Sequence, residues 1–142
     1  MSVDDPTFQA RREKARAHLD QLPGNQAQDP AGRARFFDAV YAGAKGDAAM
    51  VPWADLAPKP QLSEWLAANP GVGKSAIDIA CGLGDNAQAI AAAGYQTTAF
   101  DIVDEAIDWA RRRFAQTGVT YCCADPFNLP ADWHHAFAPV HE

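Results

Sequence analysis

The sequence has little positive charge, few cysteines and no long apolar run. Lys and Arg together number 12 against 18 Asp and Glu, which makes the net charge −6. This balance argues against a nucleic-acid backbone as the main partner. The three cysteines, of which Cys122 and Cys123 are adjacent, form no disulfide framework and lack the spacing of a zinc site.

No apolar segment approaches the roughly 20 residues that a membrane-spanning helix needs, and the N-terminus contains no signal-peptide core. We therefore expect a cytoplasmic protein with reduced thiols and no membrane partner. Large apolar side chains are also scarce, because 30 of the 142 residues are alanine. This length allows one ordinary domain, and we expect a thin core.

Two Asp-Pro pairs, at residues 5–6 and 29–30, are typical of a helix cap followed by proline in the first turn. The helix after the first pair should run to about Leu22. Its sequence is mostly polar, and we expect it to dock loosely. The helix after the second pair presents aromatic residues at helical spacing and can dock more firmly.

A long loop containing three prolines and Trp53 follows the second helix, and loops of this length often bind ligands. Pro60 then opens a short third helix. We predict an N-terminal helical arm over residues 1–30 and a helical cap with a Pro-Trp loop over residues 31–74.

After residue 74 the pattern changes to alternating strands and helices. The predicted strands are Ser75–Ala80, Gln96–Phe100 and Val119–Ala124, and the predicted helices are Asp85–Ala93 and Asp104–Gln116. This alternation indicates an α/β fold with a parallel sheet and right-handed connections. Arg111–Arg113 should form the solvated end of the second of these helices.

Glycines and acids gather where the predicted strands end. Gly82 and Gly84 follow the first strand, Asp101 ends the second, Asp125 follows the third, and Asp78 lies inside the first. Ligands of parallel sheets bind beyond this edge. Glycine allows the chain to turn sharply there and lets a ligand touch the backbone.

Two ligand classes fit this pattern. The run from Gly82 to Ala87 matches the dinucleotide fingerprint G-x-G-x-x-A, with Asp101 at a suitable distance. That fingerprint places a pyrophosphate at a helix N-terminus. Carboxylates at Asp78 and Asp85 would repel a pyrophosphate and would favour a positively charged ligand.

S-adenosylmethionine is such a ligand, since it carries an ammonium and a sulfonium beside a ribose and an adenine. Asp78 suits the cationic methionine end, Asp101 the ribose hydroxyls, and Asp125 the adenine amino group. A single strand-end aspartate is as often a turn residue. The prediction depends on the combination of the acids with the glycine turn.

Three motifs resemble those of the class I S-adenosylmethionine-dependent methyltransferases. "DIACGLGDNA" is similar to their first motif, "AFDIVDEAI" to the second and "CCADPFNLP" to the third. The likeness covers Ser75 to about Pro130. A looser likeness reaches back to Phe36 and is similar to the thiopurine and tellurite-resistance group of small-molecule methyltransferases.

This resemblance implies a Rossmann-like parallel sheet with N-terminal helices, in which residues 75–142 form a cofactor-binding half-domain. It also implies S-adenosylmethionine as the cofactor and a small-molecule methyl acceptor. Ala80 and Ile102 would join the acids and glycines in contacting the cofactor. Trp53 would be a lid residue, and the alternative is that it anchors its own loop.

The end of the chain departs from the family pattern. The family fold has seven strands in the order 3-2-1-4-5-7-6, and this chain supplies the first three. In "HHAFAPVHE", Ala138 stands where an aspartate is expected, and Pro139 disfavours a central strand. We therefore expect a truncated form that lacks strands four to seven.

The free edge of the first strand, at Ile77 and Ile79, would then need a neighbour. The candidates are the C-terminal tail, the N-terminal helices, another copy of the chain or a second polypeptide. His134, His135 and His141 have no cage of carboxylates or thiols, so we expect a tail without a metal.

Three functions stay open for this sequence. The first is a methyltransferase, or the N-terminal portion of one, with little activity from this chain alone because an aligned acceptor site is missing. The second is a non-catalytic protein that binds the nucleotide or a partner. The third is a fragment that binds NAD. No general base or nucleophilic triad is visible, so the catalytic residues are unknown.

Overall fold

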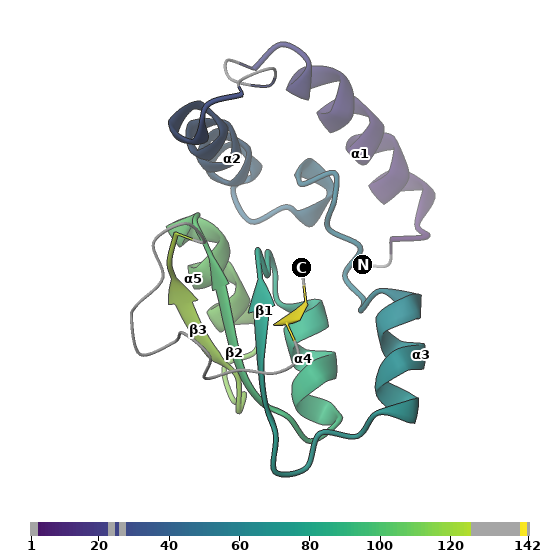
Figure 1. Ribbon diagram of the computed structural model, residues 1–142. Helices are drawn as coiled ribbons and strands as arrows, with labels where there is room; N and C mark the ends of the chain where they lie inside the picture. The colour runs from purple at the N-terminus through teal and green to yellow at the C-terminus, as the bar shows by residue number, and fades with distance from the viewer. Residues whose placement is uncertain (1–2, 23–24, 26–27, 126–139, 142) are drawn as a thin grey trace. The chain divides into compact units, whose positions relative to one another are not determined.

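The computed structural model describes residues 3–22, 25, 28–125 and 140–141. The chain divides into two units, Met1–Leu56 and Ala57–Glu142 (Figure 1). The domain limits expected at residues 30 and 74 stay predictions.

The first unit is helical, and its helices start where the Asp-Pro pairs predict. It contains α1 (Pro6–Leu19), α2 (Pro30–Ala44) and the short 3-10 helix η1 (Ala48–Met50). The Asp5 carboxylate accepts a hydrogen bond from the Thr7 N–H at 2.7 Å, and the Asp29 carboxylate accepts one from the Gly32 N–H at 2.7 Å. These caps satisfy N–H groups that have no partner inside the helix.

Helix α1 is docked more firmly than its polar sequence suggests. Phe8 and Ala15 are buried, and so is Arg12, which is only 5% exposed. The Arg12 guanidinium donates to the carbonyl of Ala54 and lies 3.7 Å from the Asp55 carboxylate. The prediction of a loosely docked helix was wrong, because a charged residue that looks solvent-facing lies on the buried side.

The second unit has the α/β architecture that the sequence predicts. Its elements are α3 (Pro60–Ala68), β1 (Ser75–Ile79), α4 (Asp85–Ala92), β2 (Gln96–Asp101), α5 (Asp104–Arg113), β3 (Thr120–Cys123) and β4 (Val140–His141). The sheet order is β3-β2-β1-β4, and every neighbouring pair is parallel. This order places the carboxyl ends of β1, β2 and β3 at one edge of the sheet, as Figure 1 shows.

The outer edge of β1 has a neighbour, which corrects the expectation that the chain supplies only three strands. Val140 pairs with Ile77 and His141 with Asp78. The C-terminal tail, one of the four candidates for this edge, therefore covers part of it. Residues 126–139, including Ala138 and Pro139, lie outside the described residues. A strand as short as β4 can directly follow a proline, because its pairing uses only residues beyond the ring.

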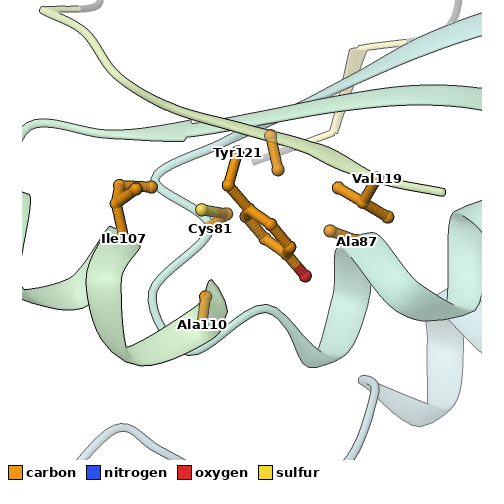
Figure 2. Close-up of a cluster of buried hydrophobic side chains, with 7 residues drawn as sticks. Cys81, Ala87, Ile107, Ala110, Val119 and Tyr121 are labelled. Atoms are coloured by element: carbon orange, nitrogen blue, oxygen red, sulfur yellow. The ribbon is translucent and has the colours of Figure 1, made fainter. Parts of the chain in front are cut away.

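Two apolar clusters join the helices to the sheet. The first lies between the sheet and helices α4 and α5 (Figure 2), and consists of Cys81, Ala87, Ala99, Ile107, Ala110, Val119 and Tyr121. The second joins α3 and α4 to β1 and consists of Leu62, Leu66, Ala76, Ile90 and Tyr95. Alanine is frequent in the first cluster, so its helices pack with small side chains, as the composition predicts.

Within the part of the chain that the structure describes, no helix combines the length and the apolarity that crossing a membrane requires.

We predict that Gly71→Ala destabilises the protein by about 1–3 kcal/mol through overpacking. An added Cβ at Gly71 would lie 2.1 Å from the ring of Tyr95. The ring is buried and its hydroxyl donates to the Asn69 carbonyl at 2.8 Å, so it has little freedom to move. Urea denaturation measures the loss. Gly118→Ala is the control, because nothing lies within 4 Å of its added Cβ; equal stability of the two variants would contradict the prediction.

Candidate functional site

The turn after β1 has a backbone conformation that is rare for residues with a side chain. The φ angles of Ala80, Gly82 and Gly84 are 57°, 54° and 94°. Gly84 is the N-cap of α4. A Cβ on Gly84 would lie 2.4 Å from the Tyr121 hydroxyl. Glycine is therefore required at this position by both the backbone angle and the packing.

Asp101 ties the three strand ends together. Its carboxylate accepts hydrogen bonds from the N–H groups of Gly82 at 3.0 Å and Val103 at 3.1 Å. Its carbonyl accepts from the Ala124 N–H at 3.0 Å, next to the end of β3.

Asp78 is a buried acid that lacks a full set of partners. It is 1% exposed, and its Oδ2 atom has no hydrogen-bond partner among the described residues. Burial raises the pKa of Asp78 to about 7, and the negative charge of Asp101 adds to the shift. Burying an unsatisfied acceptor costs stability, so such a group is expected where a ligand completes it.

The neighbouring thiol is not reactive in this environment. Burial raises the pKa of Cys81, and the carboxylates of Asp78 and Asp101 raise it further. Nucleophilic thiols need the opposite shift, since the thiolate is the reactive form. Cys81 therefore serves as a packing residue of the first cluster.

Asp85 is paired with an arginine, which changes the electrostatics predicted for this site. The Arg113 guanidinium donates to both carboxylate oxygens of Asp85, at 2.7 and 3.0 Å. The prediction of a solvated arginine run was wrong for Arg113 and correct for Arg112, which is 60% exposed. Because Asp85 is neutralised, the repulsion of an anionic ligand depends on Asp78 and Asp101.

The other predicted contacts lie at the same edge of the sheet. Ala80 follows β1, and Asp125 is exposed just after β3. Ile102 follows Asp101 and is 38% exposed, which is high for a large apolar side chain. The roles of Ala80, Ile102 and Asp125 in contacting a cofactor stay predictions.

Trp53 belongs to the first unit and is held there by aromatic neighbours. Its indole N–H donates to the Tyr41 hydroxyl at 2.9 Å. Its ring makes edge-on contacts with Phe37 and Tyr41 at centroid distances of 5.4 and 5.8 Å. These contacts support the anchoring interpretation, and the lid role stays a prediction.

Among the residues that the structure describes, no group of three or more His, Cys, Asp or Glu side chains is arranged to hold a metal ion. His134 and His135 lie outside those residues.

Sequence reasoning missed two residues that support the turn. Arg113 bonds to Asp85, 28 positions earlier in the chain. Tyr121 packs against Gly84, and its hydroxyl accepts from Gln88 Nε2 at 2.8 Å. The alternation of apolar and polar residues in β3 could have identified Tyr121 as inward-facing. No local sequence pattern indicates that Arg113 pairs with Asp85.

Comparisons with known proteins support the resemblance of the three motifs. A family model described as a methyltransferase domain matches residues 76–139, which is somewhat less than half of the chain. A solved structure described as "Conversion of a Disulfide Bond into a Thioacetal Group during Echinomycin Biosynthesis" is 30% identical with a TM-score of 0.66. The match covers 76% of this chain and 45% of that one, so the chain spans less than half the length of that relative.

Two further solved structures show weaker likeness. An S-adenosylmethionine-dependent methyltransferase from Mesorhizobium loti is 27% identical with a TM-score of 0.40, over 47% of this chain and 33% of its own. Magnesium protoporphyrin IX methyltransferase from Synechocystis PCC 6803 with bound SAM is 16% identical with a TM-score of 0.45, over 87% and 53%. No curated protein matches the sequence.

The second unit therefore has the Rossmann-like fold of a class I methyltransferase domain, as predicted. The comparisons do not distinguish the thiopurine and tellurite-resistance group from other methyltransferases.

We predict that Asp78→Asn changes the pH dependence of stability. The folded state raises the pKa of Asp78 from 3.8 to about 7, so it binds the proton more tightly than the unfolded chain does. The wild type should lose stability as the pH rises from about 4 to 7, by on the order of a few kcal/mol, and should not lose more through this group above that range. The variant should lack this loss.

Thermal unfolding of the unliganded chain across this pH range measures the effect. Glu64→Gln is the control, because Glu64 is exposed on α3 and its substitution should leave the wild-type pH dependence intact. Parallel stability curves for the wild type and Asp78→Asn would contradict the raised pKa.

Proposed function

We propose that this chain carries the cofactor-binding part of an S-adenosylmethionine-dependent methyltransferase that acts on a small molecule. The observation that supports the proposal best is the buried Asp78, whose Oδ2 atom lacks a partner beside a left-handed glycine turn. The match of residues 76–139 to a methyltransferase domain supports the same conclusion.

The residues present fit this cofactor by their chemistry. When bound, S-adenosylmethionine supplies an electrophilic methyl group on a sulfonium. Asp78 would hold the ammonium of the methionine end, since a buried carboxylate without a full set of partners gains most from a cation. The backbone at Gly82 and Gly84 would lie against the ligand, because neither residue carries a Cβ there.

The nucleoside end would lie against the ends of β2 and β3. Asp101 would accept hydrogen bonds from the ribose hydroxyls, since a carboxylate offers about four acceptor positions. Ile102 would pack on the adenine, and Asp125 would accept from its amino group. Asp101 would thus hold the turn and the ligand at once.

NAD is the second candidate, because the turn formally matches the dinucleotide fingerprint. The carboxylate of Asp101, and that of Asp78 when it is ionised, disfavour a pyrophosphate near the turn. The pairing of Asp85 with Arg113 removes one of the charges that weigh against a pyrophosphate. Calorimetry with S-adenosylhomocysteine and NAD separates the two candidates. Tighter binding of NAD would overturn the proposal.

The acceptor is proposed to be a small molecule on the likeness to the thiopurine and tellurite-resistance group. Methyl transfer needs an acceptor held in line with the methyl, and no described residue is assigned to that task. A methyl-transfer assay with thiol, arsenic and tellurium acceptors tests catalysis. Cofactor binding without turnover would favour a non-catalytic binding protein. Sedimentation at several concentrations would then show whether the chain associates with another copy of itself.

We predict that Asp101 recognises the ribose diol. Asp101→Asn leaves one accepting oxygen, so it should bind S-adenosylhomocysteine about tenfold or more weakly than the wild type. Because Asp101 also holds the turn, a loss of affinity alone does not identify ribose recognition. The 2′-deoxy analogue of the ligand separates the two roles.

The wild type should lose affinity when the 2′-hydroxyl is removed, and Asp101→Asn should lose much less for the same change. Calorimetry on the four combinations of protein (wild type or Asp101→Asn) and ligand (S-adenosylhomocysteine or its 2′-deoxy analogue) measures this difference. Equal losses in the two proteins would show that Asp101 supports only the turn.

We predict that cofactor binding releases a proton from Asp78. The unliganded protein holds a proton on this buried carboxyl up to about pH 7, whereas a bound ammonium favours the ionised form. The affinity for S-adenosylhomocysteine should therefore rise about tenfold from about pH 5.5 to about pH 7, where the ligand's amino group stays protonated. Asp78→Asn should bind weakly with little pH dependence.

Calorimetry in buffers of different ionisation enthalpy counts the protons released. The release should approach one proton per ligand at the lower pH and decline toward the higher pH. Constant affinity without proton release would show that Asp78 does not meet the ligand's cation.

A further inference from the structure

We infer that Arg113 is a positioning residue for the cofactor turn, and that it acts through Leu83 and Asp85 without touching the ligand. The inference rests on the proposed function of the turn. It concerns a residue at the far end of α5, in a segment whose sequence is typical of a solvated helix end.

The guanidinium of Arg113 bonds to the residues on both sides of Gly84. One nitrogen, Nη1, donates to the Leu83 carbonyl at 2.8 Å and to Asp85 Oδ2 at 2.7 Å. The other nitrogen, Nη2, donates to Asp85 Oδ1 at 3.0 Å. The forked geometry thus holds the residue before Gly84 by its backbone and the residue after it by its side chain.

This ion pair is shielded from water. The side chains of Arg113 and Asp85 are 23% and 17% exposed, whereas those of the neighbouring pair between Arg112 and Glu105 are 60% and 44% exposed. The first pair is also shorter, at 2.7 Å against 3.5 Å. Removing one partner of a shielded pair leaves an uncompensated charge, so it has a larger effect than removing one partner of an exposed pair, which contributes little.

Tyr121 supports the same turn from β3. Its ring packs between Cys81 and Ala87 (Figure 2), and its hydroxyl lies 3.4 Å from the Gly84 carbonyl, within reach as a donor. Burial raises the pKa of Tyr121 to about 12, so this hydroxyl keeps its proton at neutral pH. The turn therefore has an apolar and hydrogen-bonded support from the sheet and a charged one from α5.

The contacts from Arg113 to Leu83 and Asp85 matter because the sequence of the turn gives it little conformational stability of its own. Gly82 and Gly84 can adopt many backbone conformations, and Gly84 as N-cap offers α4 no side-chain hydrogen bond. If the turn were mobile, a ligand that contacts its backbone would have to order it on binding and would bind more weakly. Arg113 lowers this cost because, together with Asp101 and Tyr121, it holds the turn in one conformation before the ligand binds.

The test compares Arg113→Met with Arg112→Met in the full chain. Both variants remove one arginine from the end of α5 and keep an unbranched side chain, but only the first breaks the contact with Asp85. Calorimetry with S-adenosylhomocysteine, at a temperature where every variant is folded, should show about tenfold weaker binding for Arg113→Met. Arg112→Met should bind as the wild type does.

Two further variants test the geometry of the contact between Arg113 and Asp85. Arg113→Lys keeps the charge but not the fork, so it should restore only part of the affinity. Asp85→Asn should weaken binding in the wild type and should have little further effect in Arg113→Met, because the two residues act through one contact.

Amide hydrogen exchange gives a readout without any ligand. The Gly84 N–H bonds to the Cys81 carbonyl, and the Gln88 N–H bonds to the Gly84 carbonyl, each at 3.0 Å. Both amides should exchange faster in Arg113→Met than in Arg112→Met. This measures the order of the turn independently of cofactor identity.

The outcomes separate the inference from the proposed function. A wild-type chain that does not bind S-adenosylhomocysteine overturns the proposed function, and the positioning role falls with it. A wild type that binds, with unchanged affinity in Arg113→Met, overturns the inference alone. A lower melting temperature with unchanged affinity would identify Arg113 as a merely structural residue. Weaker binding together with faster exchange at Gly84 supports the positioning role.

Discussion

The hydrogen bonds of Asp101 determine where the ends of the three main strands meet. Its carboxylate accepts from the N–H groups of Gly82 and Val103, and its carbonyl accepts from Ala124. One residue thereby connects the turn after β1, the turn after β2 and the end of β3. The shape of the candidate site depends on this residue, because the left-handed turn at Gly82 and Gly84 has no regular secondary structure to hold it.

The three acids of the site differ in how their charges are compensated. Asp85 has an arginine partner, Asp101 has backbone donors, and the Oδ2 atom of Asp78 has no hydrogen-bond partner among the described residues. A fold selected for stability alone would not bury such an acceptor. Departures of this kind are expected at functional sites, where a ligand supplies what the chain lacks. Among these three acids, the atom that a ligand would complete is therefore Oδ2 of Asp78.

Regular patterns in the sequence predicted most of the second unit. The strands and helices from β1 to β3 lie where apolar alternation and helical spacing place them, and their ends differ from the prediction by one to three residues. Helix α5 ends at Arg113 rather than at residue 116, because Phe114 leaves the helical conformation with φ −124° and ψ 59°. The glycines and acids were also predictable, since the end of a strand fixes where its next residues lie in a parallel sheet. Whether they contact the cofactor stays a prediction.

The sequence by itself determined the order of the elements, the parallel sheet and the gathering of acids at its carboxyl edge, because these depend on local periodicity and on glycine. Only the tertiary structure decided the pairing of Arg113 with Asp85, the burial of Arg12 against Ala54, and the pairing of β4 with β1. Each joins residues far apart in the chain. An arginine has the same sequence signature whether its partner is water or a buried carboxylate, so no local pattern distinguishes the two.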